Sequence, residues 1–136
     1  MSEKPEVFKA LSDETRLRLL NIFLTAENDL CVCEMVDALQ APQYQVSKHL
    51  ATLRNTNLLT LQKEGTWSYY GLDWERPENA RLFEFLKTYL KGEPFMSDRK
   101  RLETRLLLRD QGKCVVGFVD SEELHQLIEN KMEEDA

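Results

Sequence analysis

The chain has 136 residues, with 24 acidic and 18 basic side chains and a formal net charge of −6. A chain of this length is typical of one domain that buries roughly 65–70% of its unfolded surface. The first residues lack the apolar core of a signal peptide, and no stretch approaches the ~20 apolar residues that span a membrane. We therefore expect a cytoplasmic protein without membrane contact. Its three cysteines are expected to be buried residues, ligands or redox thiols rather than disulfides.

Apolar spacing predicts two helices at the start of the chain. The first begins at about Pro5, a residue well suited to a first helical turn, and runs to Leu11. Ser12 is expected to cap the second helix, because two acidic residues that complement a helix dipole follow it directly. Leucine, isoleucine and phenylalanine residues over positions 17–24 give this second helix a wide apolar face.

The next elements form a helix-turn-helix pattern. Residues 30–32 fit either a strand stub or the approach to a third helix, and residues 34–39 continue as that short helix. A tight turn then leads into a fourth helix over residues 42–56, whose apolar positions recur at i, i+4 and i+7 from Val46. Two helices joined by a turn of about three residues are typical of DNA-binding proteins, in which the second helix enters the major groove.

The predicted recognition helix lies in a segment that has no acidic side chain, residues 38–63. Such a gap in a chain with 24 acids is what the approach of phosphates requires. His49, on the same helix, is expected to be a structural or phosphate-contacting residue rather than a metal ligand. The residues expected to contact DNA are Gln43, Tyr44, Gln45, Ser47, Lys48, His49, Thr52, Arg54 and Lys63.

A β-hairpin and a fifth helix follow. Aromatic and apolar residues at 58–62 and 67–72 flank the loop 63–66, which contains a glycine, so this segment is expected to be a wing. Pro77 opens a fifth helix that is apolar nearly all round. Such a helix is hard to cover within one small domain, and it therefore predicts a dimer interface. The fold expected is mainly α with a small β-hairpin, a dimeric winged helix-turn-helix.

The pattern weakens after residue 92, and we divide the chain there into a DNA-binding and dimerisation domain, residues 1–92, and a C-terminal extension, residues 93–136. The extension is expected to hold a basic helix over residues 98–111 and a strand-like segment over residues 113–119 that contains Cys114. A short helix over residues 121–132 then leads into an acidic end.

Cys31 and Cys33 stand about ten residues ahead of the predicted recognition helix. Two thiolates can bind a soft, thiophilic ion, so this pair predicts a ligand site that acts on DNA binding. In an unbroken helix the two side chains would point about 200° apart, and one ion could not bind both without unwinding that turn. The alternative is a pair of small buried residues.

This organisation resembles the ArsR/SmtB family of dimeric winged helix-turn-helix repressors, which sense metals and metalloids. The matching runs lie within residues 5–91: KALSDETRLRLL from Lys9, LCVCEM from Leu30, VSKHLATLR from Val46 and EGTWSYY from Glu64. Gln40 and Asn57 stand where the family often has glycine in a left-handed turn. The run Cys-Val-Cys-acid is similar to the thiol site of the arsenic-responsive members.

The resemblance implies a homodimeric repressor of an arsenic-resistance operon that binds operator DNA without a cofactor. As(III) or Sb(III), bound by Cys31 and Cys33, would release it. Cys114 either completes a three-sulfur arsenite site, from its own or the partner subunit, or packs within its apolar run. Two other functions stay open: a thiol-redox repressor of the same fold, and a small thiol metal-binding protein that does not bind DNA. No catalytic triad, phosphate loop or pair of catalytic acids stands out, so we do not expect an enzyme.

Overall fold

The computed structural model describes residues 3–135 and has seven helices and three strands within them. In chain order the elements are α1 (Glu3–Leu11), α2 (Glu14–Ala26), β1 (Leu30–Cys31), α3 (Val32–Leu39), α4 (Gln43–Asn55), β2 (Leu59–Glu64), β3 (Trp67–Leu72), α5 (Pro77–Tyr89), α6 (Phe95–Leu106) and α7 (Ser121–Glu134). The three strands form one antiparallel sheet in the order β1-β3-β2. The predicted winged helix-turn-helix is confirmed.

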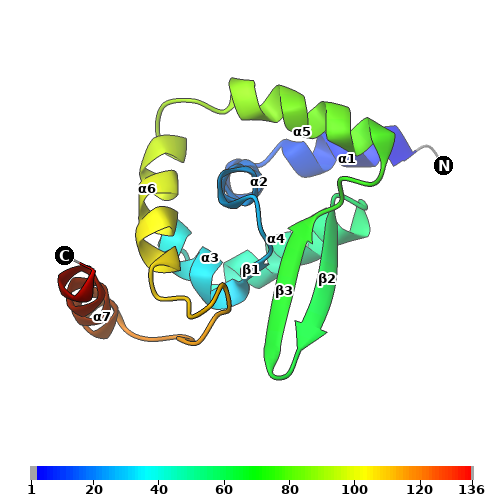
Figure 1. Ribbon diagram of the computed structural model, residues 1–136. Helices are drawn as coiled ribbons and strands as arrows, with labels where there is room; N and C mark the ends of the chain where they lie inside the picture. Colours follow the sequence, from blue (N-terminus) through cyan, green and yellow to red (C-terminus); the bar gives the residue numbers. More distant parts are fainter. Residues whose placement is uncertain (1–2, 136) are drawn as a thin grey trace.

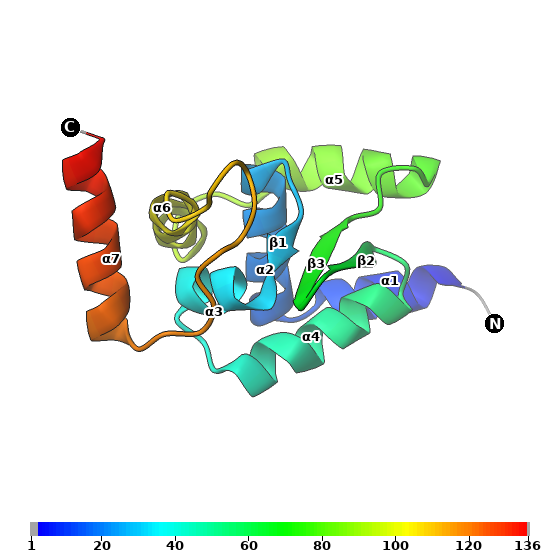
Figure 2. The ribbon, with the colours of Figure 1, turned by 60° about the horizontal axis from the view of Figure 1, so that its bottom comes forward.

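Helix α2 lies at the centre of the molecule, with α5 on one side and α3 and α4 on the other (Figures 1 and 2). Apolar residues recur at helical spacing along it, and most of this face is buried, with Leu19 and Leu20 at 0% exposed. Leu50 of α4 and Phe83 of α5 join the same core. The core therefore holds the helix-turn-helix and the fifth helix in one unit.

The N-cap of α2 differs from the prediction. Asp13, not Ser12, caps α2, because its carboxylate accepts a hydrogen bond from the backbone N–H of Arg16. The Ser12 hydroxyl instead donates to the carbonyl of Lys9 at the end of α1. The expected left-handed turns are present.

Those two turns bracket the recognition helix. Gln40 ends α3 with φ 52°, and Asn57 follows α4 with φ 65°. Glycine is the usual residue in this conformation, and asparagine tolerates it better than glutamine does. The turn between α3 and α4 is therefore made by a residue with little intrinsic preference for it, and the backbone N–H of Gln40 donates to the carbonyl of Val36.

The wing is longer than the sequence indicated, because its turn is shorter. Residues Lys63 and Glu64 continue β2, and only Gly65 and Thr66 connect the strands. Gly65 has φ 61°, the left-handed conformation that a two-residue hairpin turn needs. Figure 1 shows the hairpin projecting from the body of the molecule.

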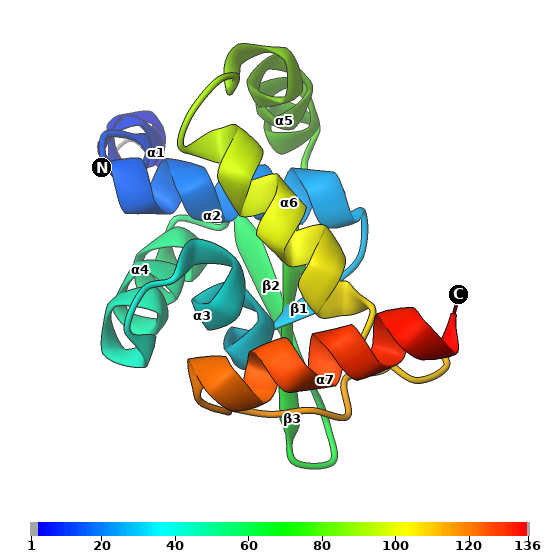
Figure 3. The same ribbon diagram turned by 90° about the vertical axis from the view of Figure 1, so that its left-hand side faces the viewer.

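The extension packs against the winged helix-turn-helix through α6. This helix covers residues Phe95–Leu106 instead of the expected 98–111, and a left-handed turn at Gln111 and Gly112 follows it. It lies across α2 and α3 (Figure 3). Asp98 of α6 is 0% exposed and accepts two hydrogen bonds from Arg18 of α2, at 2.7 and 2.8 Å. The α6 helix is thus anchored to the core by a buried ion pair.

Residues 113–119 were expected to be strand-like, and that prediction is wrong. Only an isolated bridge joins Asp110 to Lys113, and the segment then runs as a loop along α3 and α6. The reason is that the carbonyls of Val116 and Gly117, which a strand would offer to a neighbouring strand, accept hydrogen bonds from the guanidinium of Arg105. The guanidinium of Arg105 thus takes the place of the backbone hydrogen bonds that a neighbouring strand would supply.

The last helix, α7, is two residues longer than predicted, and Asp120 caps it by accepting from the N–H of Glu123. None of residues 121–134 is fully buried. Within residues 3–135 no helix is both long and apolar enough to cross a membrane.

Replacement of Asp98 tests the anchoring of α6. We expect Asp98→Asn to lower the free energy of unfolding by about 3 kcal/mol, because it leaves the facing guanidinium of Arg18 without its counter-charge. Urea unfolding monitored by circular dichroism measures this loss. Glu103→Gln, on the exposed side of the same helix, serves as the control and should change stability by less than about 0.5 kcal/mol. Equal midpoints for the two variants would contradict the assignment.

Candidate metalloid site and nucleic-acid interface

Cys31 and Cys33 lie on either side of the junction between β1 and α3. Cys31 is extended, with φ −85° and ψ 155°, and is the N-cap of α3, whereas Cys33 is in its first turn. No continuous helix therefore runs through both residues, and the 200° separation considered for an unbroken helix does not apply. The break in the helix that one shared ion would need is already present in the fold.

Cys114 of the same chain joins the pair. Its sulfur lies 3.7 Å from the sulfur of Cys33, and the sulfur of Cys31 lies within 4.8 Å of it. The three residues are 2–4% exposed. Two thiolates on one four-coordinate ion stand about 3.8 Å apart, given metal–sulfur bonds of roughly 2.3 Å. The spacing of Cys33 and Cys114 thus fits a shared thiophilic ion.

The loop that carries Cys114 is held from two sides. The backbone N–H of Cys114 donates to the hydroxyl of Tyr69 on the wing strand β3, at 3.1 Å. On the other side, the side chain of Arg105 is almost fully buried. It donates to Asp37 of α3 at 2.7 Å and to the carbonyls of the loop at 2.7 and 3.1 Å. Cys114 is therefore placed by interactions with both the wing and α3.

The three thiols differ in acidity. The pKa of Cys33 is lowered, first by its hydrogen bonds with Cys114 and Cys31 and then by the positive charge of Arg105. The pKa of Cys31 is raised by hydrogen bonding to the other two thiols and by burial. For Cys114 the interaction with Cys31 lowers the pKa, but hydrogen bonding to Cys33 and burial outweigh it and raise the pKa. The cluster thus ionises first at Cys33, and a second thiolate beside the first is disfavoured.

A surface pocket of about 360 Å³ lies beside two of the three cysteines. Cys31 and Cys33 line it together with Gln43, the first residue of the recognition helix, and Trp67, the first residue of β3. A small ligand could therefore approach Cys31 and Cys33 from this side. It would lie beside both elements that are expected to contact DNA.

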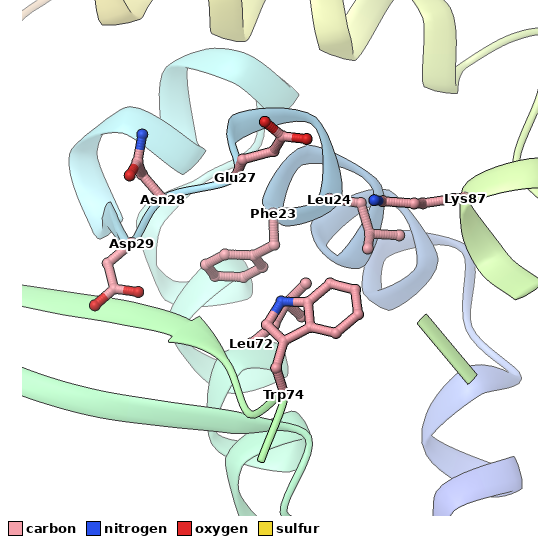
Figure 4. Close-up of a pocket in the computed structure, with 8 residues that line it drawn as sticks. All are labelled: Phe23, Leu24, Glu27, Asn28, Asp29, Leu72, Trp74 and Lys87. Carbon is pink, nitrogen blue, oxygen red and sulfur yellow. The ribbon is translucent and has the colours of Figure 1, made fainter. Parts of the chain in front are cut away.

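A second pocket, of about 260 Å³, lies between the end of α2, the base of the wing and α5, and no thiol lines it (Figure 4). Figure 4 shows the rings of Phe23 and Trp74 in its middle and the ammonium group of Lys87 at one side. That ammonium lies 5.7 Å from the centroid of the Trp74 ring. This pocket contains none of the residues that the sequence singled out.

The predicted DNA-contacting residues fall mostly on one exposed surface. Gln43, Tyr44, Gln45, Ser47, Lys48 and Arg54 are exposed on α4, Thr52 is half-buried, and Lys63 is exposed on the wing. His49 differs: it is 8% exposed, and its Nδ1 lies 3.0 Å from a guanidinium nitrogen of Arg16. The structure gives His49 a packing position between α4 and α2, in line with the structural alternative.

Sequence reasoning missed four residues that shape the thiol site: Glu34, Tyr69, Arg105 and Arg109. A signal for two of them was available, because Arg105 and Arg109 are four residues apart and so share a face of any helix that contains both. The acid that follows Cys33 was noted only as part of a motif. Its burial could not be inferred, since its partner is 75 residues away.

Three comparisons bear on what the chain is. Residues 13–60 match the model of the bacterial regulatory protein arsR family. The chain is 44% identical over 77 residues to an arsenic resistance transcriptional regulator of Pseudomonas putida, covering 57% of this chain and 66% of that protein. It is 43% identical over 67 residues to the arsenical resistance operon repressor of Escherichia coli, covering 49% and 56%. The matches thus span less than two thirds of these relatives.

Among solved structures, HlyU from Vibrio cholerae N16961 superposes with a TM-score of 0.57 at 31% identity, over 64% of this chain and 90% of that one. Fold, recognition helix and wing define a winged helix-turn-helix regulator. The chain belongs to the arsR family of bacterial regulatory proteins, and the two relatives from Pseudomonas putida and Escherichia coli are named as a transcriptional regulator and an operon repressor.

The lowered pKa of Cys33 predicts one thiolate per chain near neutral pH. A free cysteine has a pKa of about 8.5, so a lowered value means that Cys33 ionises at a lower pH than unfolded thiols do. We expect the ultraviolet thiolate absorbance of the folded, reduced protein at pH 7 to disappear in Cys33→Ser and to persist in Cys31→Ser. If thiolate absorbance followed the same curve against pH in the wild type and in Cys33→Ser, Cys33 would not be the thiol that ionises first.

Proposed function

We propose that the protein is a DNA-binding repressor of an arsenic-resistance operon, and that As(III) or Sb(III) releases it by binding to Cys31, Cys33 and Cys114. The observation that carries this proposal is the convergence of three buried thiols, with Cys114 next to both others, at the start of the helix that precedes α4. The names of the arsenic-resistance relatives support the choice of inducer. No cofactor is invoked for DNA binding.

The proposed DNA surface combines α4 and the wing. Lys48 and Arg54 would contact phosphates, and Gln43, Tyr44, Gln45 and Ser47 would face the groove, with Lys63 on the wing. The absence of acidic residues from positions 38–63 supports this surface, because it removes repulsion between the protein and the phosphates.

The proposal includes a homodimer, formed by α1 and α5. Phe8 is 70% exposed on α1, and Phe85 and Tyr89 are 54% and 67% exposed on α5. The last two stack with ring centroids 4.9 Å apart. Large aromatic side chains that are exposed on one chain are typical of an interface. A two-fold axis there would set two recognition helices roughly 34–36 Å apart, about one turn of DNA.

Residues 1–92 would then read DNA and form the dimer, and the extension, residues 93–136, would complete the sensor. Ligand binding changes DNA affinity only if the two conformations differ in their affinity for the ligand. In this fold the thiols belong to the β1–α3 junction and to the Cys114 loop. Helix α3 packs against α4, and β1 pairs with β3, with Cys31 opposite Tyr69. A shift of the junction therefore reaches the recognition helix and the wing together.

A second candidate function is redox sensing by the same protein. Cys33 and Cys114 have sulfurs 3.7 Å apart, and a disulfide would require them to approach to about 2.05 Å. In that reaction a peroxide accepts two electrons and two protons from the two thiols and is reduced to water or an alcohol. The third candidate, a thiol metal-binding protein without DNA, would be favoured only by failure to bind the DNA upstream of its own gene.

Serine variants of the three cysteines test the proposed sensor. Each of Cys31→Ser, Cys33→Ser and Cys114→Ser should keep operator affinity, because no thiol belongs to the DNA surface. Each should lose sensitivity to arsenite, because the three-sulfur site is then incomplete. The measurement is fluorescence anisotropy of operator-bound protein titrated with arsenite under reducing conditions. A parallel titration with peroxide, in samples from which the reductant has been removed, distinguishes redox sensing from metalloid sensing.

The compound that releases the protein from DNA distinguishes the two candidate functions. Release of wild type by peroxide but not by arsenite would favour the redox function. If Cys31→Ser and Cys33→Ser still dissociated at the wild-type arsenite concentration, these thiols would not be the sensor. If only Cys114→Ser did so, two thiols would suffice and Cys114 would have a packing role.

Replacement of Lys48 tests the DNA surface. Lys48→Ala should weaken binding across DNA sequences and lower the slope of log K against log salt by about one unit, because one phosphate contact is lost. The salt dependence of operator binding, measured by anisotropy, gives the slope. Lys87→Ala, on α5, is a matched control and should leave the slope unchanged. A wild-type slope in Lys48→Ala would place this residue away from the DNA.

A further inference from the structure

A carboxylate lies within the thiol cluster. Glu34 is 0% exposed, and one of its oxygens lies within 4.8 Å of the sulfurs of both Cys31 and Cys114. A buried charge next to two sulfurs is costly unless it is paired, and it is also a good ligand for a divalent ion such as Zn²⁺. Glu34 could therefore act as a ligand beside Cys31 and Cys114, with Cys33, whose sulfur lies 3.7 Å from that of Cys114, as the remaining sulfur.

The oxygens of Glu34 are already engaged. Oε2 accepts a hydrogen bond from Nε of Arg109 at 2.7 Å, and Oε1 accepts from Nη2 of Arg109 at 2.7 Å and from the N–H of Cys31 at 2.9 Å. The same guanidinium also donates to the carbonyl of Asp29 at 2.7 Å and to that of Gly112 at 3.3 Å. The guanidinium of Arg109 thus makes two hydrogen bonds to the carboxylate, and the two backbone carbonyls hold it in that orientation.

We propose that Arg109 determines which ions the thiol site accepts, by keeping the carboxylate of Glu34 from becoming a fourth ligand. The site then offers three sulfurs, which suit a trivalent metalloid, and discriminates against divalent ions that prefer four ligands. The inference rests on the proposed function, because it concerns the specificity of the same site.

The charge balance supports this assignment. Three sulfurs that replace the three hydroxyl groups of arsenous acid give a neutral complex and three molecules of water without a change in oxidation state; a thiol that is already ionised leaves one proton to come from solvent. A divalent ion bound by three thiolates gives a complex with one net negative charge, and the remaining thiol protons go to solvent. Arg109 cancels the charge of Glu34, and Arg105 likewise faces Asp37, so neither carboxylate adds negative charge that would attract a dication.

The planar guanidinium is important for this role. Its two parallel N–H donors match the two oxygens of a carboxylate, which a lysine ammonium cannot do. Removal of Arg109 would leave Glu34 both unpaired and close to two sulfurs. Capture of a dication would then relieve a buried, uncompensated charge.

The experiment measures binding of Cd²⁺ alone and of arsenite alone to the reduced full chain, without DNA, by equilibrium dialysis. In Arg109→Met we expect the ratio of cadmium to arsenite affinity to rise on the order of tenfold, the size of effect that partners of metal ligands usually have. Arg101→Met is the matched control, since Arg101 also donates both to a backbone carbonyl, that of Ala38, and to a carboxylate, but its carboxylate is Asp98 and not Glu34. Its ratio should equal that of the wild type.

Two further variants identify the ligand. Arg109→Met combined with Glu34→Gln should return the ratio to the wild-type value, because the amide is a poor ligand. Glu34→Gln alone should leave the ratio unchanged and keeps the proposal testable if Arg109→Met fails to fold. An unchanged ratio in Arg109→Met, or loss of cadmium affinity in Glu34→Gln alone, would overturn the proposal. A protein that arsenite does not release from DNA would contradict the proposed function and not this inference, because the binding assay contains no operator.

Discussion

Two ion pairs determine where the third thiol lies: Asp37 of α3 with Arg105 of α6, and Glu34 of α3 with Arg109, just beyond the end of α6. Charges that leave water must be paired, and each of these arginines also donates to backbone carbonyls near the loop that carries Cys114. The loop has no strand partner, so these donors replace the hydrogen bonds of a sheet. The geometry of the sulfurs therefore depends on electrostatic contacts that are made outside the site itself.

Much of the fold follows from local sequence. The apolar spacing of α2 and α4 indicates the helix-turn-helix, and the glycine between an apolar strand and an aromatic-rich strand indicates the wing, because each signal acts over a few neighbouring residues. The cap of α2 was misassigned because Ser12 and Asp13 are both good capping residues, and only the tertiary structure selects between them.

The sensor could be predicted only in part. The pair Cys31 and Cys33 is visible as a local motif, whereas Cys114 lies 81 residues beyond Cys33. An apolar run around a cysteine is typical of a strand. Nothing local to residues 113–119 indicates that Arg105 donates hydrogen bonds to the backbone carbonyls of this segment. Tyr69 and Glu34 were missed for the same reason: each acquires its role from a partner that is distant in sequence.

In the proposed function, the order of these elements along the chain separates the residues that would read DNA from those that would choose an ion. The segment from α6 to Cys114 supplies one thiol and both arginines, and it lies after the residues that match the family model and after the proposed DNA surface. Substitutions in this segment can therefore change the chemistry of the ligand site without altering the face of α4. In evolutionary terms, one operator-reading unit can be combined with different ligand preferences through changes confined to a short, separate stretch of sequence.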